Sequence, residues 1–201
     1  MMEEKETEGL AWMPWRLLLG SKSPRRRDLL AQLGLPYRVV EIEVEETLQH
    51  AVAADRVAEV LSRKKAEAYG STLAADEVLV TADTVVVHDD VVLGKPHSRQ
   101  EALEMLHALS GRTHQVYTGV TLRREHSTTS FTERTDVVFA TLTEDETVHY
   151  VDCYRPYDKA GAYGIQEWIG LMGVERIDGC FYNVMGLPVS RLYKELKRLV
   201  D

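Results

Sequence analysis

The spacing of apolar and polar residues along this chain predicts an alternation of strands and helices. One almost wholly apolar stretch runs from position 78 to 87, and Thr81, Asp83 and Thr84 are its polar members. Such a run is typical of a strand that is buried on both faces near the centre of a sheet. Asp89 and Asp90 then predict a turn into a short strand.

Other segments complete an α/β pattern. Strands are predicted over 16–19, 37–43, 91–93, 114–124 and 128–141, and helices over 24–33, 52–69, 98–111, 143–153 and 189–199. Capping boxes mark two of the helix starts: Ser98 with Glu101, and Thr143 with Glu146. The two long strands are joined by a polar turn and are therefore expected to be antiparallel. We expect an α/β fold, a mixed twisted sheet flanked by helices.

The composition is that of one globular domain. Of the 201 residues, 44% are hydrophobic, which is enough for a single sizeable core. Positions 1–15 are expected to form a flexible acidic tail, and 16–201 a single domain. The formal net charge is −8, and an acidic protein repels polyanions at long range. We therefore expect no nucleic acid among its partners.

The start of the chain and its cysteines bear on location. The first nine residues are acidic and polar and lack the order of a signal peptide, and no apolar run approaches the length of a membrane span. Cys153 and Cys180 have no metal-ligand spacing and fit a reduced compartment, where we expect them as buried free thiols. The sequence therefore predicts a cytoplasmic protein without a membrane partner.

The turn after the first predicted strand has the design of an anion site. It leads into a helix that carries Arg25, Arg26 and Arg27 in its first turns. Ser23 is a favourable N-cap and Pro24 a favourable first helical residue, so free backbone N–H groups point into the turn. Three guanidinium groups at the positive end of a helix dipole repel it unless an anion neutralises them, and phosphate is the obvious candidate. The alternative is a capped helix with solvated arginines.

Asp83 interrupts the apolar central strand, where a charge is costly unless it is paired. Either it binds a divalent metal ion or activates a water as general base, or it is a structural carboxylate that caps a neighbouring turn. An acidic run follows the second strand, and strand alternation places Glu41, Glu43 and Glu45 on one side. Glu46 is left at the strand exit, where it can join Asp83 around a metal ion.

Five further polar residues are candidates for the site. Lys95 lies in a tight turn at the end of a hairpin, as either a fixed ammonium group or a solvated lysine. Lys64 and Lys65 share a helix, so at most one of them can face the site. Thr118 either bonds a phosphate or simply belongs to a strand. Gln166 follows a flexible segment of small residues, and its amide either reads a base edge or faces solvent.

Several motifs in this chain occur in the order seen in the Maf family, which the chain resembles from about position 16 onward. The motifs are Ser21-x-Ser23-Pro24-Arg25-Arg26, Ala82-Asp83-Thr84, Gly94-Lys95-Pro96, Ser110-Gly111-Arg112-Thr113-His114, Tyr117-Thr118-Gly119 and Ala160-Gly161-Ala162-Tyr163-Gly164-Ile165-Gln166. Each motif alone is unspecific, but chance agreement of so many in order is negligible.

The resemblance implies two lobes around a deep cleft, similar to the fold of inosine triphosphate pyrophosphatases, and a homodimer. It implies hydrolysis of nucleoside triphosphates to the monophosphate and pyrophosphate, a housekeeping reaction on the nucleotide pool. The implied cofactor is a divalent cation, usually Mg²⁺, with Mn²⁺ or Co²⁺ as alternatives. Because Gln166 follows Tyr163-Gly164-Ile165, the resemblance favours the branch that acts on dTTP and UTP over the branch that acts on 7-methyl-GTP.

The resemblance also assigns roles by position in the motifs. Asp83 matches the family's proton acceptor, while Arg25, Thr84 and Gln166 match positions tied to substrate choice. The expected catalytic residues are Asp83, Lys95 and Glu46, and the expected metal ligands are Asp83 and Glu46. The expected substrate-binding residues are Ser21, Arg25, Arg26, Lys65, Thr84, Thr118 and Gln166.

Competing interpretations stay open. The family name is also attached to inhibition of septum formation, so one alternative is a nucleotide-binding regulator of cell division. Another is a phosphatase that removes only the terminal phosphate. Trp168 departs from the family pattern, and a bulky ring beside Gln166 is expected to narrow the base pocket or cover the ligand.

Overall fold

The computed structural model describes residues 13–45 and 51–200. Within these ranges one mixed sheet has the order β2-β1-β3-β5-β6-β7, and β4 pairs with β3 beside this path. The strands are β1 Arg16–Leu19, β2 Tyr37–Val39, β3 Glu77–His88, β4 Val91–Leu93, β5 Thr113–Arg123, β6 Thr128–Phe139 and β7 Val174–Asp178. β1 is parallel to β2 and β3, whereas the other pairs are antiparallel. The predicted mixed sheet is confirmed.

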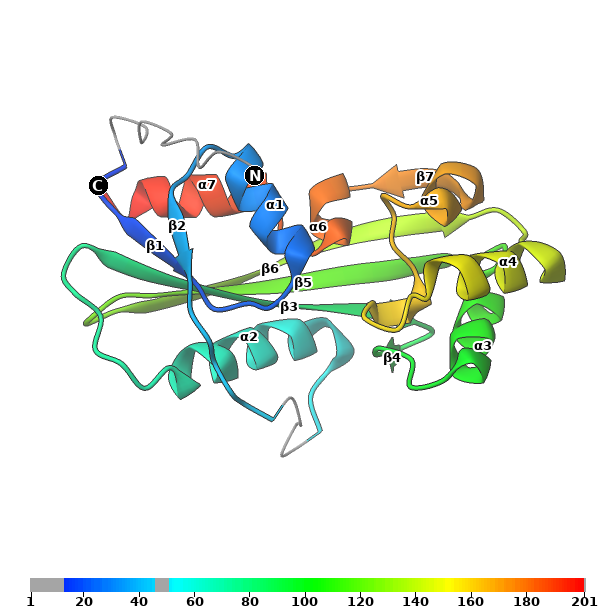
Figure 1. Ribbon diagram of the computed structural model, residues 1–201, viewed down its shortest axis with the longest axis horizontal. Helices are drawn as coiled ribbons and strands as arrows, with labels where there is room; N and C mark the ends of the chain where they lie inside the picture. Colours follow the sequence, from blue (N-terminus) through cyan, green and yellow to red (C-terminus); the bar gives the residue numbers. More distant parts are fainter. Residues whose placement is uncertain (1–12, 46–50, 201) are drawn as a thin grey trace.

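Helices cover both faces of this sheet (Figure 1). α1 and α7 lie on one face and α2 lies on the opposite face, while α3 and α4 lie together near one end of the long strands. The helices are α1 Pro24–Gln32, α2 Val57–Ala68, α3 Arg99–Leu109, α4 Glu144–Tyr154, α5 Trp168–Gly173, α6 Phe181–Met185 and α7 Val189–Arg198. Two single turns of 3₁₀ helix are η1 Ala54–Arg56 and η2 Ala160–Ala162.

The apolar strands are buried from both sides because successive side chains point to opposite faces. In β1, Leu17 and Leu19 pack into a cluster that includes Leu30 of α1 and Leu192 of α7. Leu18 packs on the other side into a second cluster under α2. A third cluster fills the far end of the sheet beneath α3 and α4. The elements therefore form two groups that share the long strands β3, β5 and β6.

One edge of β3 is open at its middle. β3 pairs with β1 from Glu77 to Val80 and with β4 only from Val86. Between these points, residues 81–85 have no strand neighbour on that side within the described chain, while β5 pairs with them on the other side. Asp83 and Thr84, which point to opposite faces of the sheet, therefore both border the same open edge.

Several local predictions are confirmed and others are corrected. Thr143 forms a complete capping box with Glu146 at the start of α4. Ser98 accepts a hydrogen bond from the backbone N–H of Glu101, as predicted, but the Glu101 carboxylate accepts from the His97 N–H instead of from Ser98. Ser23 occupies the N-cap of α1 without a side-chain cap bond. The second strand ends at Val39, although exposed and half-buried residues alternate from Val39 to residue 45.

The first residues and the two cysteines differ in part from what the sequence predicts. Residues 1–12 lie outside the described residues, so the acidic tail stays a prediction. Met13 and Trp15, placed at the end of that tail, pack against the cluster around β1. Both cysteines are free, as predicted, but Cys153 is exposed and Cys180 is half-buried. Among the described residues no helix has the length and apolar character needed to cross a membrane.

Candidate active site

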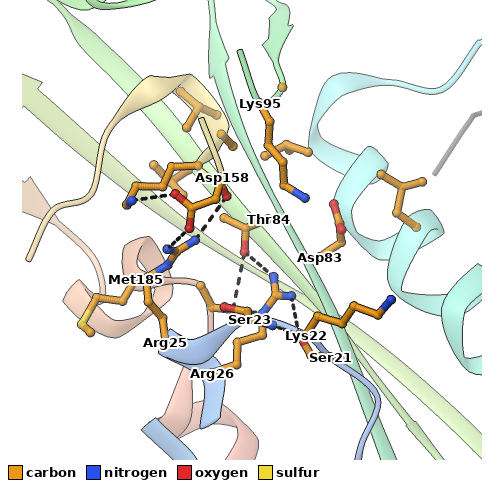
Figure 2. A pocket seen from close by; sticks show the side chains of 18 of the residues that line it. Ser21, Lys22, Ser23, Arg25, Arg26, Asp83, Thr84, Lys95, Asp158 and Met185 are labelled. Carbon is orange, nitrogen blue, oxygen red and sulfur yellow. Dashed lines mark hydrogen bonds and ion pairs between the residues drawn. The ribbon is translucent and has the colours of Figure 1, made fainter. Parts of the chain in front are cut away.

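A cavity of about 1090 Å³ opens beside the free edge of β3 (Figure 2). It is walled by the turn between β1 and α1, the segment at 40–44, the middle of β3, the residues after β4 and the loop at 158–166. Side chains from both faces of the sheet converge on it. The cleft that the resemblance implies is thus formed where the two groups of elements meet.

Asp83 stands at the wall of this cavity and is paired with a lysine. The Nζ of Lys65, on α2, donates to Asp83 Oδ1, and each side chain is 12% exposed. Asp83 Oδ2 has no hydrogen-bond partner among the described residues. A buried carboxylate is tolerated when a cation compensates it. Lys65 therefore holds the Asp83 carboxylate in one orientation and leaves its second oxygen available to a ligand or a water.

Arg26 ties three segments of the cavity wall together. Its guanidinium group donates to the carbonyl of Gly186 at 2.7 Å, to Thr84 Oγ1 at 3.1 Å and to Ser21 Oγ at 3.2 Å. Ser21 Oγ also accepts from the backbone N–H of Ser23 at 3.3 Å. Ser21, and not Ser23, therefore supplies the hydroxyl oxygen at the turn before α1. Arg26 is half-buried and held in place before any ligand binds.

Arg25 contacts the opposite wall. Its guanidinium group donates to Asp158 Oδ2 at 2.7 Å and lies 3.4 Å from the Asp158 carbonyl oxygen. Asp158 Oδ1 accepts from Lys159 Nζ at 2.7 Å. Burial raises the pKa of Asp158, but the hydrogen bonds from Lys159 and Arg25 outweigh it and lower the pKa to about 2. Asp158 is therefore ionised at neutral pH.

Two residues do not lie where the sequence suggested. Thr118 is fully buried and is not among the residues that line the cavity. Its hydroxyl shares a 2.9 Å hydrogen bond with Thr84 Oγ1 and donates to the carbonyl of Asn183 at 2.9 Å. The predicted phosphate contact of Thr118 is thus wrong, because the side chain orients Thr84 from behind. Arg27 is exposed and is also absent from the cavity lining.

The structure describes one of the two predicted metal ligands, Asp83. Glu46 lies outside the described residues, so its place near Asp83 stays a prediction. The residues at 13–45 and 51–200 contain no group of three or more His, Cys, Asp or Glu side chains that could hold a metal ion. Mg²⁺ is commonly bound by one or two carboxylates together with substrate phosphates. Asp83, with one unbonded oxygen facing an open cavity, fits such a site.

Lys95 and Gln166 both line the cavity. Figure 2 shows the Lys95 ammonium group pointing toward the space beside Asp83 and Thr84. Gln166 is exposed, and its side-chain amide has no hydrogen-bond partner among the described residues. Trp168 does not line the cavity; its ring packs edge-on against His149 of α4, with centroids 5.0 Å apart. Trp168 therefore does not narrow the cavity, and its covering of a bound ligand stays a prediction.

The charge of the cavity lining is opposite in sign to the net charge of the whole chain. Among the described residues that line it, cationic side chains outnumber carboxylates by six to four, although the chain carries a net charge of −8. The cations are Lys22, Arg25, Arg26, Lys65, Lys95 and Lys159. Lys65 and Lys95 flank Asp83, and the N-terminus of α1 opens onto the same space. An elongated anion is the ligand that these charges suit.

His114 supports the loop that carries Gln166. It is fully buried, its Nε2 lies 2.8 Å from the Tyr163 hydroxyl, and its ring meets Phe139 edge-on. Burial, aided by the charge of His88, lowers the pKa of His114 to about 3, and Asp136 opposes this shift only weakly. Folded His114 therefore stays neutral under conditions in which the unfolded chain binds a proton.

We expect this histidine to destabilise the fold in mild acid. Because the unfolded state binds more protons between pH 6.5 and about 3, the free energy of unfolding falls as the pH drops through that window. The slope from one such group is at most about 1.4 kcal/mol per pH unit. Urea unfolding measures the free energy of unfolding of the wild type and of His114→Gln at several pH values from 7 to 5. The two curves of free energy against pH should converge as the pH falls. The curve of His126→Gln, a substitution at an exposed site, should match that of the wild type. Parallel profiles for His114→Gln would contradict the expectation.

Sequence reasoning missed Asp158, Lys159 and Glu167. Asp158 and Lys159 directly precede the small-residue segment that ends at Gln166. Adjacent opposite charges usually indicate a solvated surface, and the pattern does not show that Lys159 is only 8% exposed. The position beside a suspected binding loop was the available signal.

Known proteins match this chain at the level of a family and of individual sequences. A family model described as Maf-like protein matches residues 16–199. The chain is 50% identical over 186 residues to a dTTP/UTP pyrophosphatase of Bacteroides thetaiotaomicron, which covers 92% of this chain and 96% of the relative. It is 42% identical over 187 residues to one of Chlorobaculum parvum, with coverage of 92% and 94%. The solved Staphylococcus aureus Ham1 protein aligns distantly, with a TM-score of 0.40 and 14% identity over 62% of this chain and 72% of that chain.

Proposed function

The chain belongs to the Maf family, and we propose that its cavity hydrolyses dTTP and UTP to the nucleoside monophosphate and pyrophosphate. The observation that carries the proposal is the placement of Asp83: a single carboxylate at the open edge of β3, between the cations of α1, α2 and the Lys95 turn. Relatives at up to 50% identity carry the name dTTP/UTP pyrophosphatase.

The cations of the cavity are suited to hold a triphosphate. Arg26 is already oriented by Ser21, Thr84 and the Gly186 carbonyl, so little side-chain entropy is lost when it binds phosphate. Arg25 reaches the same space from the preceding position of α1, and Lys95 reaches it from the turn after β4. These charges neutralise the leaving pyrophosphate, which is the main requirement of phosphoryl transfer.

Asp83 is suited to orient or deprotonate the water that attacks the α-phosphorus. Lys65 occupies Oδ1, so Oδ2 is the oxygen that we assign to the water. A Mg²⁺ ion bound by Asp83 and phosphate oxygens would neutralise charge on the triphosphate, and Glu46 is the second carboxylate that we propose for it. Gln166 offers both a donor and an acceptor to a pyrimidine base edge.

Product analysis tests the proposal. The purified protein is incubated with Mg²⁺ and dTTP, UTP, CTP, 7-methyl-GTP or a common purine triphosphate, and products are resolved by chromatography. We expect monophosphate and pyrophosphate, mainly from dTTP and UTP. Diphosphate with orthophosphate would instead identify a terminal phosphatase. Nucleotide binding without turnover would favour a regulator of cell division, which has no use for a carboxylate in this position.

We also propose the homodimer that the resemblance implies and the cytoplasmic location that the start of the chain and its cysteines predict. Size-exclusion chromatography with light scattering measures the first directly. A mass of one chain, 22.8 kDa, at all protein concentrations would contradict the homodimer without affecting the proposed reaction.

A further inference from the structure

A set of bonded side chains lies beneath the turn that carries Gln166. Tyr150, from α4, donates its hydroxyl hydrogen to Glu167 Oε2, and the same hydroxyl oxygen accepts from the backbone N–H of Gly164 at 2.9 Å. Lys159 Nζ lies 3.1 Å from Glu167 Oε1. We call Tyr150, Lys159 and Glu167 the Gln166 brace. The brace bonds to the backbone of Gly164 before Gln166 and to the side chain of Glu167 after it. The Gln166 side chain itself is not part of these bonds.

The backbone of this turn is packed as tightly as its side chains. The Glu167 N–H donates to the Gly164 carbonyl at 2.9 Å, which closes a four-residue turn around Gln166. A Cβ atom at Gly164 would lie 2.8 Å from Glu167 Cδ and 3.0 Å from Lys159 Cε. A Cβ atom at Gly170 would lie 1.8 Å from the carbonyl oxygen of Ile165. The glycines therefore allow α5 and the brace to close directly on the turn.

Burial makes these polar contacts strong. Tyr150 is fully buried and Lys159 is 8% exposed, so an unmade bond here leaves a desolvated polar group unpaired. Burial, followed by the bond to Glu167, raises the pKa of Tyr150 well above its usual range. The tyrosine hydroxyl therefore remains protonated and keeps Glu167 as its acceptor.

The brace continues to the other end of the cavity. Lys159 Nζ is also 2.7 Å from Asp158 Oδ1, and Asp158 Oδ2 accepts from Arg25. Figure 2 shows Asp158 between Arg25 and the loop that leads to Gln166. One continuous line of charges thus joins the helix of the predicted phosphate site to the turn of the predicted base site.

We propose that Tyr150 and Glu167 are positioning residues that set base selectivity by holding the backbone of the turn from which the Gln166 amide reaches into the cavity. This inference rests on the proposed function in taking a pyrimidine nucleotide as the ligand. An amide on a mobile turn could bond to either exocyclic group of a pyrimidine after rearrangement. An amide that reaches the base from a fixed backbone position penalises the base whose donors and acceptors do not match.

The test compares nucleotides that differ only at the base edge. Binding of α,β-methylene UTP and α,β-methylene CTP is measured by calorimetry with the wild type, Tyr150→Phe, Glu167→Ala and Glu167→Gln. Tyr150→Phe removes one hydroxyl and keeps the ring. We expect it to reduce the ratio of the affinity for the uracil analogue to the affinity for the cytosine analogue about tenfold. Glu167→Ala is expected to have the same effect. Glu167→Gln keeps an acceptor for Tyr150 and should retain most of the ratio.

A matched control lies one turn along the same helix. The Tyr154 ring stacks on Tyr150 with centroids 5.1 Å apart, and the residue is 40% exposed. Tyr154→Phe keeps the ring that stacks on Tyr150, removes a hydroxyl that is not part of the brace, and is expected to leave the ratio unchanged. Equal losses of affinity for both analogues in Tyr150→Phe and Glu167→Ala, with an unchanged ratio, would reduce the brace to a structural element and overturn the proposal.

A second readout does not depend on catalysis. Amide hydrogen exchange at Gly164 is expected to be at least about tenfold faster in Tyr150→Phe than in the wild type, because the N–H loses its buried acceptor. Unchanged exchange at Gly164 would show that Tyr150 does not hold the turn and would overturn the proposal.

A wild type that prefers the uracil analogue but releases no pyrophosphate from UTP would refute the proposed function and leave the role of the brace intact. A wild type that binds both analogues equally overturns the selectivity role.

Discussion

Asp83→Asn is expected to reduce kcat on the order of 10³-fold, a loss typical of removing a general base. Affinity for a non-hydrolysable nucleotide should remain within a few-fold of the wild type. The amide oxygen of asparagine can still accept the hydrogen bond from Lys65, so the side chain keeps its place. Only the negative charge and the basicity of the group are lost.

The charge argument fixes the direction of the binding effect. A carboxylate at the cavity wall repels a triphosphate that is not neutralised by a metal ion, so its removal favours anion binding in the absence of Mg²⁺. With Mg²⁺ present the variant also loses a ligand for the ion. Titration of α,β-methylene dTTP with and without Mg²⁺ should therefore show the wild type gaining more affinity from the ion than the variant does.

Asp76→Asn is the matched control for this experiment. Asp76 immediately precedes β3 and is paired with Arg16 at 2.7 Å, but both side chains are more than half exposed and distant from the cavity. Exposed pairs contribute little to stability, so this variant should keep full turnover. Wild-type turnover by Asp83→Asn would exclude Asp83 as the general base, and weakened binding in metal-free buffer would contradict the charge argument.

The central part of the fold was predictable because burial on both faces restricts sequence strongly. β3 needs apolar side chains at nearly every position, and this made Asp83 conspicuous within it. The turn at Asp89 and Asp90 was also predictable, since short acidic pairs tolerate the positive φ angles of 48° and 62° found there. Helices with Ser or Thr caps were placed within a few residues of their true ends.

The segment between Gln166 and the last helix could not be predicted. α5 and α6 have six and five residues, too short to show a helical period. β7 is an edge strand, and three of its five residues are exposed. Its place in the sheet depends on pairing with β6 from Asp136 to Phe139, which no local pattern specifies. These elements are set by tertiary packing.

The site was only partly predictable for a related reason. Spacing along the chain identified Arg25, Asp83 and Gln166 as unusual, but it did not show what each one contacts. Arg25 and Asp158 are 133 positions apart. Whether Thr84 or its neighbour Thr118 faces the cavity depends on where β1 ends and β4 begins alongside β3. That boundary is a property of the assembled sheet.

Gly119→Ala is expected to lower the free energy of unfolding by about 3 kcal/mol, the upper part of the range for overpacking a core. Gly119 pairs with Asp83 in the sheet, and a Cβ atom there would lie 2.3 Å from both Ala58 C and Glu59 N. The obstacle is the backbone of α2, which no side-chain rotation can relieve. The helix must move away from the sheet.

This movement reaches the site because α2 also carries Lys65. A shifted helix weakens the contact between Lys65 and Asp83, so kcat/KM should fall together with stability. Gly70→Ala is the control, since no heavy atom lies within 4 Å of its Cβ position and its φ angle is not positive. Urea unfolding and turnover of both variants test the argument. Wild-type stability of Gly119→Ala would mean that α2 does not rest on β5 at this point, and normal turnover in a destabilised variant would separate the position of α2 from the chemistry of Asp83.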